Sequence, residues 1–549
     1  MLTFHNLAEN FRFLVLEVAD QVEATHAYLG LADPVLHERI VSRDDHIDNL
    51  KVLLENLCFA TIHAQRNYNK QQINLIRARH TISVNLERIA DFCVNIIRQT
   101  GFLKNRCILD EFHWEPFFEE IRPCFPLIIP VLEHNDLSKA LVICQAEMHL
   151  DDLYKQAFDR VMGRLRGGRE VEDLVTLIFI FRYLERIGDS LLNIGEALLA
   201  AIIGEKIKIT QFDALQKTLS GAGVREPINR INYESYLGTR SGCNISRIDS
   251  GGDPRHGKPA RSTIFKGGQP KKIKRERENL AAWQKISPGL VPQVISFHEE
   301  TEQAAMLVEF IAGPTMDEVV LGHDPALLEH AFATLEETLP RLWDLSKTDI
   351  PAPSQAIAQL LDRLDRIRLI HPRLFRGSAR LNERDIESFT ILSRKAADLE
   401  KEVAAPCTVF IHGDCNANNI VFNQANRRIH FIDVYRSQPG DYLQDMAVLL
   451  VSFFRLPVFE AGARSRLNQA AARIHRLAAS YAAANHDQSA SFRLALHLAR
   501  SFFTSVRFEL NARFAREMLM RGHYLLEKVS LTPPGQIPAF TMPEEIIYY

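Results

Sequence analysis

Apolar residues recur at three- and four-residue intervals through the first 217 residues, with little turn punctuation outside 101–130. One such series is Leu184, Ile187, Leu191 and Ile194. This spacing is typical of amphipathic helices that bury one face in a bundle. We therefore predict an all-α domain at 1–217.

The pattern changes after a glycine-containing segment at 220–227, which predicts a linker at 218–231. Short segments with β-branched residues and glycines follow and predict a small mixed sheet. Helical spacing then returns, interrupted by a strand-like piece at 408–411 and a predicted hairpin at 420–433. The proline-containing stretch 531–549 predicts a poorly packed tail.

Composition places the chain among folded soluble proteins, with 46% hydrophobic and 24% charged residues. A net charge of −3 disfavours nucleic acid as a partner. The eight cysteines form no CxxC pair, which favours reduced thiols over a disulfide or zinc framework. The first residues lack the order of a signal peptide, and the apolar runs are too short to span a bilayer. We expect a cytoplasmic protein without a transmembrane segment.

A loop after a strand-like segment carries the residue types that phosphoryl transfer requires. In Phe410–Phe422 (FIHGDCNANNIVF), Asp414 follows His412 and Gly413 and is separated from Asn419 by four residues. Transfer from ATP needs a carboxylate that orients the attacking hydroxyl, and oxygen ligands for Mg²⁺. Asp414 is the candidate base. Asn419 and Asp433, the latter at the end of the following hairpin, are the candidate Mg²⁺ ligands. The alternative is that both aspartates are turn or cap residues.

This ordered set resembles the aminoglycoside phosphotransferase and choline kinase superfamily, which has a protein-kinase-like fold. The common family loop HGDLHPGNI corresponds here to HGDCNANNI, with differences at residues 415–418. The later run GDYLQDMA echoes a family segment in which an aspartate, here Asp445, supports the catalytic loop, as does His412. The differences lie between the functional residues, so they leave catalysis intact and the substrate open.

The resemblance covers about residues 232–530. It implies an ATP- and Mg²⁺-dependent phosphotransferase with an α+β bilobal fold. The amino lobe would occupy 232–312, and the carboxy lobe, with a helical substrate subdomain, 313–530.

Further candidates for ATP binding lie in the predicted amino lobe. In this fold a strand lysine contacts the α- and β-phosphates and is held by a helix glutamate. Lys266 and Glu276 fit these positions, and Glu278 is an alternative glutamate on the same helix. The alternative for the whole charged run at 274–278 is a solvated helix face without a role in ATP binding. Weaker signals place a glycine loop over the phosphates and a hinge strand beside adenine, at Gly242, Glu309 and Ile311.

The helical half contains an internal repeat. Asn85–Ile96 (NLERIADFCVNI) matches Tyr183–Ile194 (YLERIGDSLLNI) nearly position for position, and DDHID at 44–48 weakly matches EMHLD at 147–151. The two halves therefore predict duplicated three-helix bundles. Each repeat places two acidic residues one helical turn apart on the same face, four pairs in all: Asp44 and Asp48, Glu87 and Asp91, Glu147 and Asp151, Glu185 and Asp189.

Residues 1–217 resemble PhoU, the helical regulator of bacterial phosphate signalling. The resemblance implies that the acidic pairs bind a transition metal or another divalent cation, that the helical half forms a homodimer, and that it has a phosphate-signalling partner. The alternative for the acidic pairs is solvated charges and intrahelical ion pairs.

Two functions follow from these patterns. The first is a kinase that phosphorylates a hydroxyl of a small molecule, such as an amino alcohol, a sugar or an antibiotic-like compound, with a regulatory or oligomerising helical half. The second is a regulator whose helical half docks on a transporter or sensor, while the kinase half senses nucleotide or modifies a protein. Acidic residues are sparse among the arginines of 446–530, which disfavours a polycationic acceptor.

Overall fold

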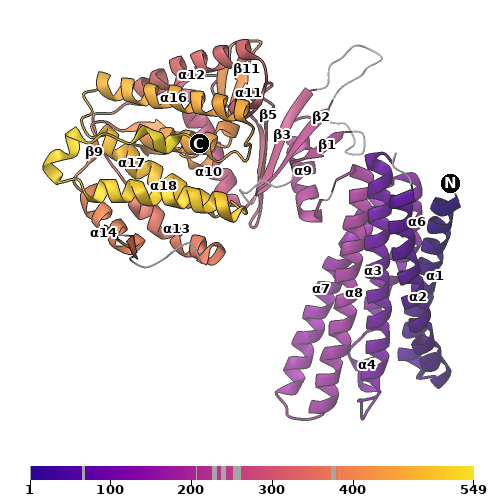
Figure 1. The fold of residues 1–549 in the computed structure, drawn as a ribbon. Coiled ribbons are helices and arrows are strands. Elements are labelled where there is room, and N and C mark those ends of the chain that lie inside the picture. Colours follow the sequence, from indigo (N-terminus) through magenta and orange to yellow (C-terminus); the bar gives the residue numbers. More distant parts are fainter. Residues whose placement is uncertain are drawn as a thin grey trace. The chain divides into compact units, whose positions relative to one another are not determined.

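The computed structural model describes residues 2–64, 68–205, 207–224, 231–236, 243–250, 261–372, 379–381 and 384–549. The chain forms two compact units, Met1–Gly267 and Gly268–Tyr549 (Figure 1). The predicted domain boundaries lie at other positions and remain predictions. None of the described helices is long and apolar enough to cross a membrane.

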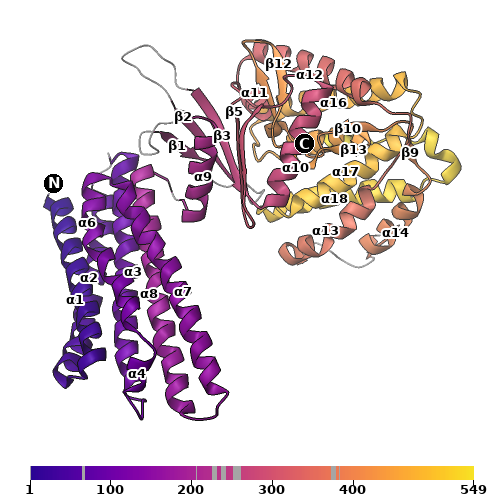
Figure 2. The same cartoon turned by 180° about the vertical axis from the view of Figure 1, so that it is seen from behind.

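The first unit is dominated by long helices that form two sets of three, which confirms the predicted fold of the amino-terminal half (Figure 2). In the second set, prolines divide the first helix into short consecutive pieces, because proline is tolerated in the first turn of a helix and disrupts its interior. The elements are α1 (Leu2–Leu31), α2 (Pro34–Ala64), α3 (Lys70–Thr100), α4 (Ile108–Glu111), α5 (Glu115–Ile121), η1 (Arg122–Cys124), α6 (Phe125–His134), α7 (Leu137–Leu165), α8 (Val171–Ile203) and α9 (Ile209–Gly221).

The two copies of the sequence repeat lie on α3 and α8, and these helices pack against each other. Asn193 Nδ2 donates to Asn85 Oδ1 at 3.1 Å. The rings of Phe92 and Tyr183 are stacked, with centroids 6.1 Å apart. An early position of each copy therefore meets a late position of the other copy, which shows that the two copies run antiparallel where they pack.

Three antiparallel strands complete the first unit: β1 (Asn232–Ser235), β2 (Asn244–Ser250) and β3 (Arg261–Gly268). Lys266 on β3 lies opposite Ile245 on β2. Ser246 Oγ donates to the Tyr233 hydroxyl at 2.7 Å, which joins β2 to β1 inside the sheet. The predicted location of Lys266 on a strand is confirmed, although the strand continues to Gly268 rather than ending at the lysine.

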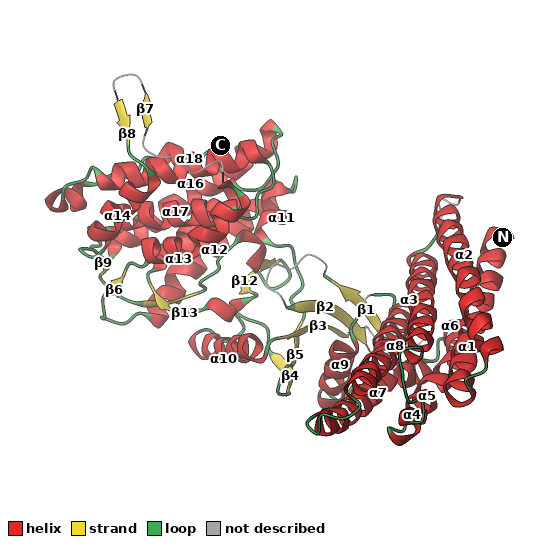
Figure 3. Ribbon diagram, turned by 90° about the horizontal axis from the view of Figure 1, so that it is seen from below, coloured by secondary structure: helices red, strands yellow, loops and turns green. Residues whose placement is uncertain are grey.

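The second unit begins with α10 (Pro270–Ile286) and the antiparallel hairpin of β4 (Val294–Glu299) and β5 (Ala304–Glu309). Helices form most of the remainder, with short strand pairs between them (Figure 3). The helices are α11 (Met316–Leu321), α12 (Pro325–Ser346), α13 (Ala356–Ile370), α14 (Phe389–Glu400), α15 (Tyr442–Phe454), α16 (Ala461–Ala484), α17 (Ala490–Val506) and α18 (Ala512–Ser530). The strands pair as β6 (Ala352–Pro353) with β9 (Ala404–Ala405), β7 (Ala379–Leu381) with β8 (Arg384–Ile386), β10 (Val409–Ile411) with β13 (Gln438–Gly440), and β11 (Ile420–Asn423) with β12 (Arg428–Phe431).

The prediction of a poorly packed tail is wrong. Residues 531–549 contain two short helices, η6 (Pro534–Ala539) and η7 (Glu544–Ile547). Ile537, Ile546 and Ile547 are buried, and the Tyr549 ring packs 5.6 Å from that of Phe454. Apolar residues between and after the prolines therefore anchor the segment, and burial outweighs the low helical propensity of proline.

The eight cysteines are all free thiols, and six of them are buried. This agrees with the expectation of mostly buried thiols.

Candidate active site

The loop that carries Asp414 begins directly after β10 and turns sharply at Gly413. Gly413 has φ = 78°, and a Cβ atom there would lie 2.2 Å from the carbonyl oxygen of Arg436. A side chain would therefore be strained and would also clash with the backbone. Only glycine allows the segment after the β11–β12 hairpin to approach the loop this closely.

Asp445, in the first turn of α15, anchors this loop through hydrogen bonds. Its two carboxylate oxygens accept hydrogen bonds from the backbone N–H groups of His412 (2.6 Å) and Gly413 (2.9 Å). Burial raises the pKa of Asp445, whereas His412 and the two N–H donors lower it. His412 Nε2 lies 3.0 Å from the Ile432 carbonyl oxygen and so links the loop to the end of the hairpin. The hydrogen bonds expected from Asp445 are thus present.

Asp414 is held at both carboxylate oxygens. Its Oδ1 accepts a hydrogen bond from Asn416 Nδ2 at 2.8 Å, and its Oδ2 lies 3.2 Å from Arg436 Nη1. Burial lowers the pKa of Arg436, but the Asp414 carboxylate and the Tyr435 hydroxyl outweigh it and raise the pKa overall. Arg436 therefore stays charged. The Asp414 side chain is 20% exposed, so it is oriented and still reachable from outside.

The β11–β12 hairpin brings together the two chain segments that carry the candidate Mg²⁺ ligands, Asn419 and Asp433. Ile420 lies opposite Phe431, and Ile432 N donates to the Asn419 carbonyl oxygen at 3.0 Å. Asp433 follows in the left-handed region (φ = 58°, ψ = 53°), a costly conformation for a residue with a side chain.

The donor set at this position suits Mg²⁺. Asn419 Nδ2 donates to the Asp414 carbonyl oxygen at 2.9 Å, so Oδ1 is the atom of this amide that suits a cation. An amide oxygen and the Asp433 carboxylate are the hard oxygen ligands that Mg²⁺ prefers, together with phosphate oxygens.

Sequence reasoning missed the residues that fix the segment after Asp433. Asn279 on α10 donates to three carbonyl oxygens there, those of Val434, Tyr435 and Ser437, at 2.8, 3.1 and 3.1 Å. Ser437 Oγ in turn donates to the His412 carbonyl oxygen at 3.1 Å. Asn279 directly follows the charged residues 274–278 of the same helix. A single asparagine in a helix does not by itself indicate a structural role of this kind.

The other residues predicted to bind ATP are divided between the two units, and one of them lies outside the described residues. Lys266 is buried on β3 of the first unit, and Glu276 is buried on α10 of the second. Glu278 is exposed, which favours Glu276 as the buried glutamate of this helix. Glu309 ends β5, Ile311 follows it, and Gly242 lies outside the described residues. The pairing of Lys266 with Glu276 remains a prediction.

The eight acidic residues of the repeat gather in two groups. In the first group, burial together with Asp91 and Asp48 raises the pKa of Asp44 to about 6. Burial also raises the pKa of Glu87, Asp91, Glu147 and Glu185, with further contributions from neighbouring carboxylates of each group. The repeat therefore does bring its carboxylates together.

Within the described residues, no three or more His, Cys, Asp or Glu side chains lie in an arrangement that could hold a metal ion. In the second acidic group the carboxylates are engaged by basic residues on their own helices. Glu185 pairs with Arg182 at 2.7 Å, and Asp151 pairs with Lys155 at 3.0 Å. These contacts favour intrahelical ion pairs over a metal cluster in this group.

Replacing Asp44 by asparagine is expected to stabilise the first unit at neutral pH. The raised pKa means that the ionised carboxylate is disfavoured in the folded state, so stability falls as pH rises from about 4, the unfolded pKa, to about 6. Solvent screens these charges because Asp44 is partly exposed, so we expect the variant to gain about 1 kcal/mol of stability at pH 7.5. Amide hydrogen exchange of α2 should show slower opening in Asp44→Asn at pH 7.5 and no difference near pH 4. An equal gain in the exposed control Asp45→Asn would contradict this origin.

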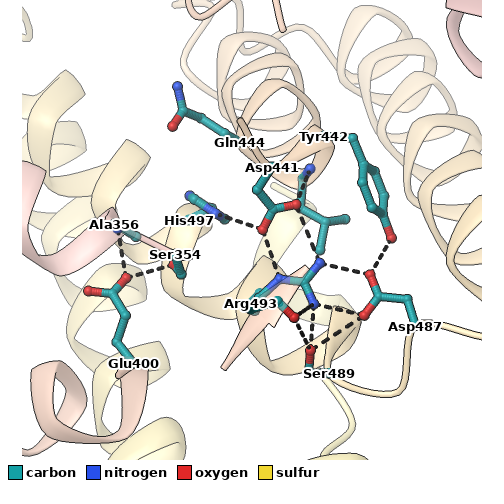
Figure 4. A network of polar contacts seen from close by, with 12 residues as sticks. Ser354, Ala356, Glu400, Asp441, Tyr442, Gln444, Asp487, Ser489, Arg493 and His497 are labelled. Carbon is teal, nitrogen blue, oxygen red and sulfur yellow. Dashed lines mark hydrogen bonds and ion pairs between the residues drawn. The ribbon is translucent and has the colours of Figure 1, made fainter. Parts of the chain in front are cut away.

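A buried ionic network supports the base of α15 (Figure 4). Arg493 on α17 is fully buried, and its guanidinium contacts Asp441 at 2.8 Å and Asp487 at 2.7 Å. Asp441 is the N-cap of α15 and accepts from Leu443 N at 3.0 Å. Burial raises the pKa of Asp441, but Arg493 and His497 outweigh it and hold the pKa well below its usual range. The network fixes the helix that carries Asp445.

Comparison with known proteins agrees with both halves of this description. Residues 17–100 and 120–198 match the family model of the PhoU domain, and residues 253–487 match that of the phosphotransferase enzyme family. A phosphate-specific transport system accessory protein PhoU homolog from Clostridium acetobutylicum is 26% identical over 197 residues, which span 35% of this chain and 87% of that protein.

Among solved structures, PhoU from Streptococcus pneumoniae is 20% identical and covers 38% of this chain and 99% of its own, with a TM-score of 0.35. An aminoglycoside phosphotransferase from Streptomyces rimosus is 18% identical and covers 54% of this chain and 99% of its own, with a TM-score of 0.34. The two family matches confirm the resemblances read from the sequence: the amino-terminal region is similar to the PhoU domain, and the carboxy-terminal region is similar to the phosphotransferase enzyme family.

Proposed function

We propose that this protein transfers the γ-phosphoryl group of ATP to a hydroxyl of a small molecule. The observation that carries the proposal is the arrangement around Asp414, which is oriented at both oxygens, partly exposed and tied to Asn419 and the hairpin that leads to Asp433. The match of residues 253–487 to the phosphotransferase enzyme family supports the same chemistry.

In this reaction Asp414 orients the acceptor hydroxyl and takes its proton as the oxygen attacks the γ-phosphorus. A bond forms between the acceptor oxygen and phosphorus, and the bond from phosphorus to the β,γ-bridging oxygen breaks, so that ADP leaves. Asn419 and Asp433 would hold the Mg²⁺, which when bound neutralises charge on the donor phosphates. Lys266, Glu276, Gly242, Glu309 and Ile311 remain predicted ATP contacts.

A second function is favoured by the PhoU domain match. Curated relatives of the helical half are described as accessory proteins of a phosphate-specific transport system. We propose on this basis, as the alternative to the kinase activity, that the helical half docks on a transporter or sensor, while the kinase half senses nucleotide or modifies a protein. The homodimer and the phosphate-signalling partner of the helical half remain predictions. The cytoplasmic location and a metal in the helical half remain predictions.

The test of the first proposal is ADP release by the full-length chain with ATP and Mg²⁺ across a panel of hydroxyl compounds. We expect at least one compound to stimulate release and its phosphorylated product to appear. In Asp433→Ala this turnover should fall below detection, because a metal ligand is lost. Undiminished turnover in Asp433→Ala would place the active site elsewhere, and absence of turnover with every compound would favour the regulatory function.

A further inference from the structure

Arginine side chains from three separate segments lie within electrostatic range of Asp414. Arg363 is on α13, Arg436 follows the β11–β12 hairpin, and Arg500 and Arg507 are at the end of α17. Each of the four interacts electrostatically with the Asp414 carboxylate. Helices α13 and α17 pack together, and His371 Nε2, at the C-cap of α13, lies 3.0 Å from the Val506 carbonyl oxygen of α17.

The arginines are also close enough to one another to repel. Burial lowers the pKa of Arg363 and Arg507, and the charge of Arg436 lowers both further. Burial, then Arg363, lowers the pKa of Arg500 to about 10, which leaves it charged at neutral pH. Charged groups with such shifted pKa values concentrate at functional sites, where a bound anion would offset the repulsion.

Arg500 is the most informative member of this group. It is 4% exposed, and its Nε and Nη2 atoms are buried without a hydrogen-bond partner in the described part of the chain. The Nε of Arg507, two turns further along α17, is also buried and without a partner. A buried guanidinium with unsatisfied donors is costly, so a native structure that retains it needs an explanation.

The nearby carboxylates do not satisfy these donors. Both oxygens of Asp445 accept from backbone N–H groups. Asp414 is engaged by Asn416 and Arg436. The contacts of the Asp414 carboxylate thus go to residues other than the arginines of α13 and α17. These arginines add positive charge near Asp414.

We propose that the acceptor carries an anionic group, a carboxylate or a phosphate ester, in addition to the hydroxyl that is phosphorylated, and that Arg363, Arg500 and Arg507 bind this group next to Asp414. The proposal rests on the phosphotransferase function. The planar guanidinium offers paired N–H donors that match both carboxylate and phosphate geometry. An anion bound here would satisfy the donors of Arg500 and offset the repulsion among the arginines. A cationic acceptor would meet like charges instead.

The test compares matched hydroxyl compounds that differ in charge, with the full-length chain, ATP and Mg²⁺. Glycerol 3-phosphate and glycerate represent the anionic class, glycerol the neutral class, and choline the cationic class, and each class is extended with sugars, sugar phosphates and amino sugars. We expect the highest kcat/KM within the anionic class. A highest kcat/KM in the neutral or cationic class would overturn the proposal.

Variants identify the residues that bind the anion. Arg500→Gln, and separately the less buried Arg507→Gln and Arg363→Gln, should raise KM for the anionic acceptor about 10- to 100-fold, because a charged hydrogen bond is lost, while KM for ATP changes less than about twofold. Arg516→Gln, an exposed arginine of α18, is the matched control and should leave both values unchanged. An unchanged acceptor KM in both Arg507→Gln and Arg363→Gln would overturn the assignment, even if Arg500→Gln failed to fold.

A binding measurement separates this inference from the proposed activity. Calorimetric titration of the nucleotide-free chain with inorganic sulfate and with glycerol 3-phosphate should detect binding that weakens about tenfold or more in Arg507→Gln and Arg363→Gln. If no hydroxyl compound is phosphorylated but these anions bind in this way, the activity is refuted and the anion site stands. If turnover occurs and neither anion binds, the anion site is refuted and the activity stands.

Discussion

Replacing Asp414 by asparagine is expected to lower kcat about 10²- to 10⁴-fold, the range that general-base catalysis contributes. The amide keeps the shape of the carboxylate, and Asn416 and Asn419 still hold the loop. Asparagine cannot take the proton of the acceptor hydroxyl, and it loses the ionic contact with Arg436. The defect should therefore appear in the chemical step.

Single-turnover kinetics with ATP in excess measure this step, and fluorescence titration with a nucleotide analogue measures ATP affinity separately. ATP affinity is expected to change less than about threefold, because Asp414 is not among the predicted phosphate or metal ligands. Asp398→Asn, which removes an exposed carboxylate of α14, serves as the matched control. A kcat in Asp414→Asn within a factor of three of the unaltered protein would exclude Asp414 as the base.

Replacing Arg493 by methionine is expected to destabilise the second unit by about 3–5 kcal/mol. The side chain is fully buried and bridges Asp441 and Asp487, so its removal leaves two buried carboxylates without their charged partner. Burial would then weigh more at Asp441 and raise its pKa in the variant, so that protonation of this carboxylate relieves part of the defect. The destabilisation should accordingly shrink as the pH falls from 8 to about 5.

Hydrogen exchange of the α15 and α17 amides in the full-length chain measures this loss locally. Lys395→Met removes a charge from an exposed pair with Glu387 and should cost less than about 1 kcal/mol. Equal losses in the two variants, or a loss in Arg493→Met that does not change with pH, would mean that the ionic network does not stabilise this region as argued.

The sequence was most informative where function and local structure share a short segment. The loop with Asp414 and the hairpin from Ile420 to Asp433 were predicted because strand alternation, a polar turn and the functional residues fall within one continuous stretch. The helical repeat was equally clear in the sequence, because its two copies, Asn85–Ile96 and Tyr183–Ile194, match nearly position for position.

Features assembled from distant segments were not predictable in the same way. The arginine group draws on residues 363, 436, 500 and 507, and only the fold brings them to Asp414. The signal in the sequence was faint: Arg493, His497, Arg500 and Arg507 recur on one face of a helix that reads as ordinary and amphipathic. The tail differs from its prediction because Ile537, Ile546 and Ile547 are buried, although prolines precede each of them.

The contact between α3 and α8 shows how the two copies of the repeat are arranged. Asn85, the first residue of one copy, meets Asn193 near the end of the other, and Phe92, late in the first copy, meets Tyr183 at the start of the second. The two copies therefore run antiparallel where they pack. A substitution at any of these four positions alters a contact between the copies, so the sequence of one copy constrains the sequence of the other.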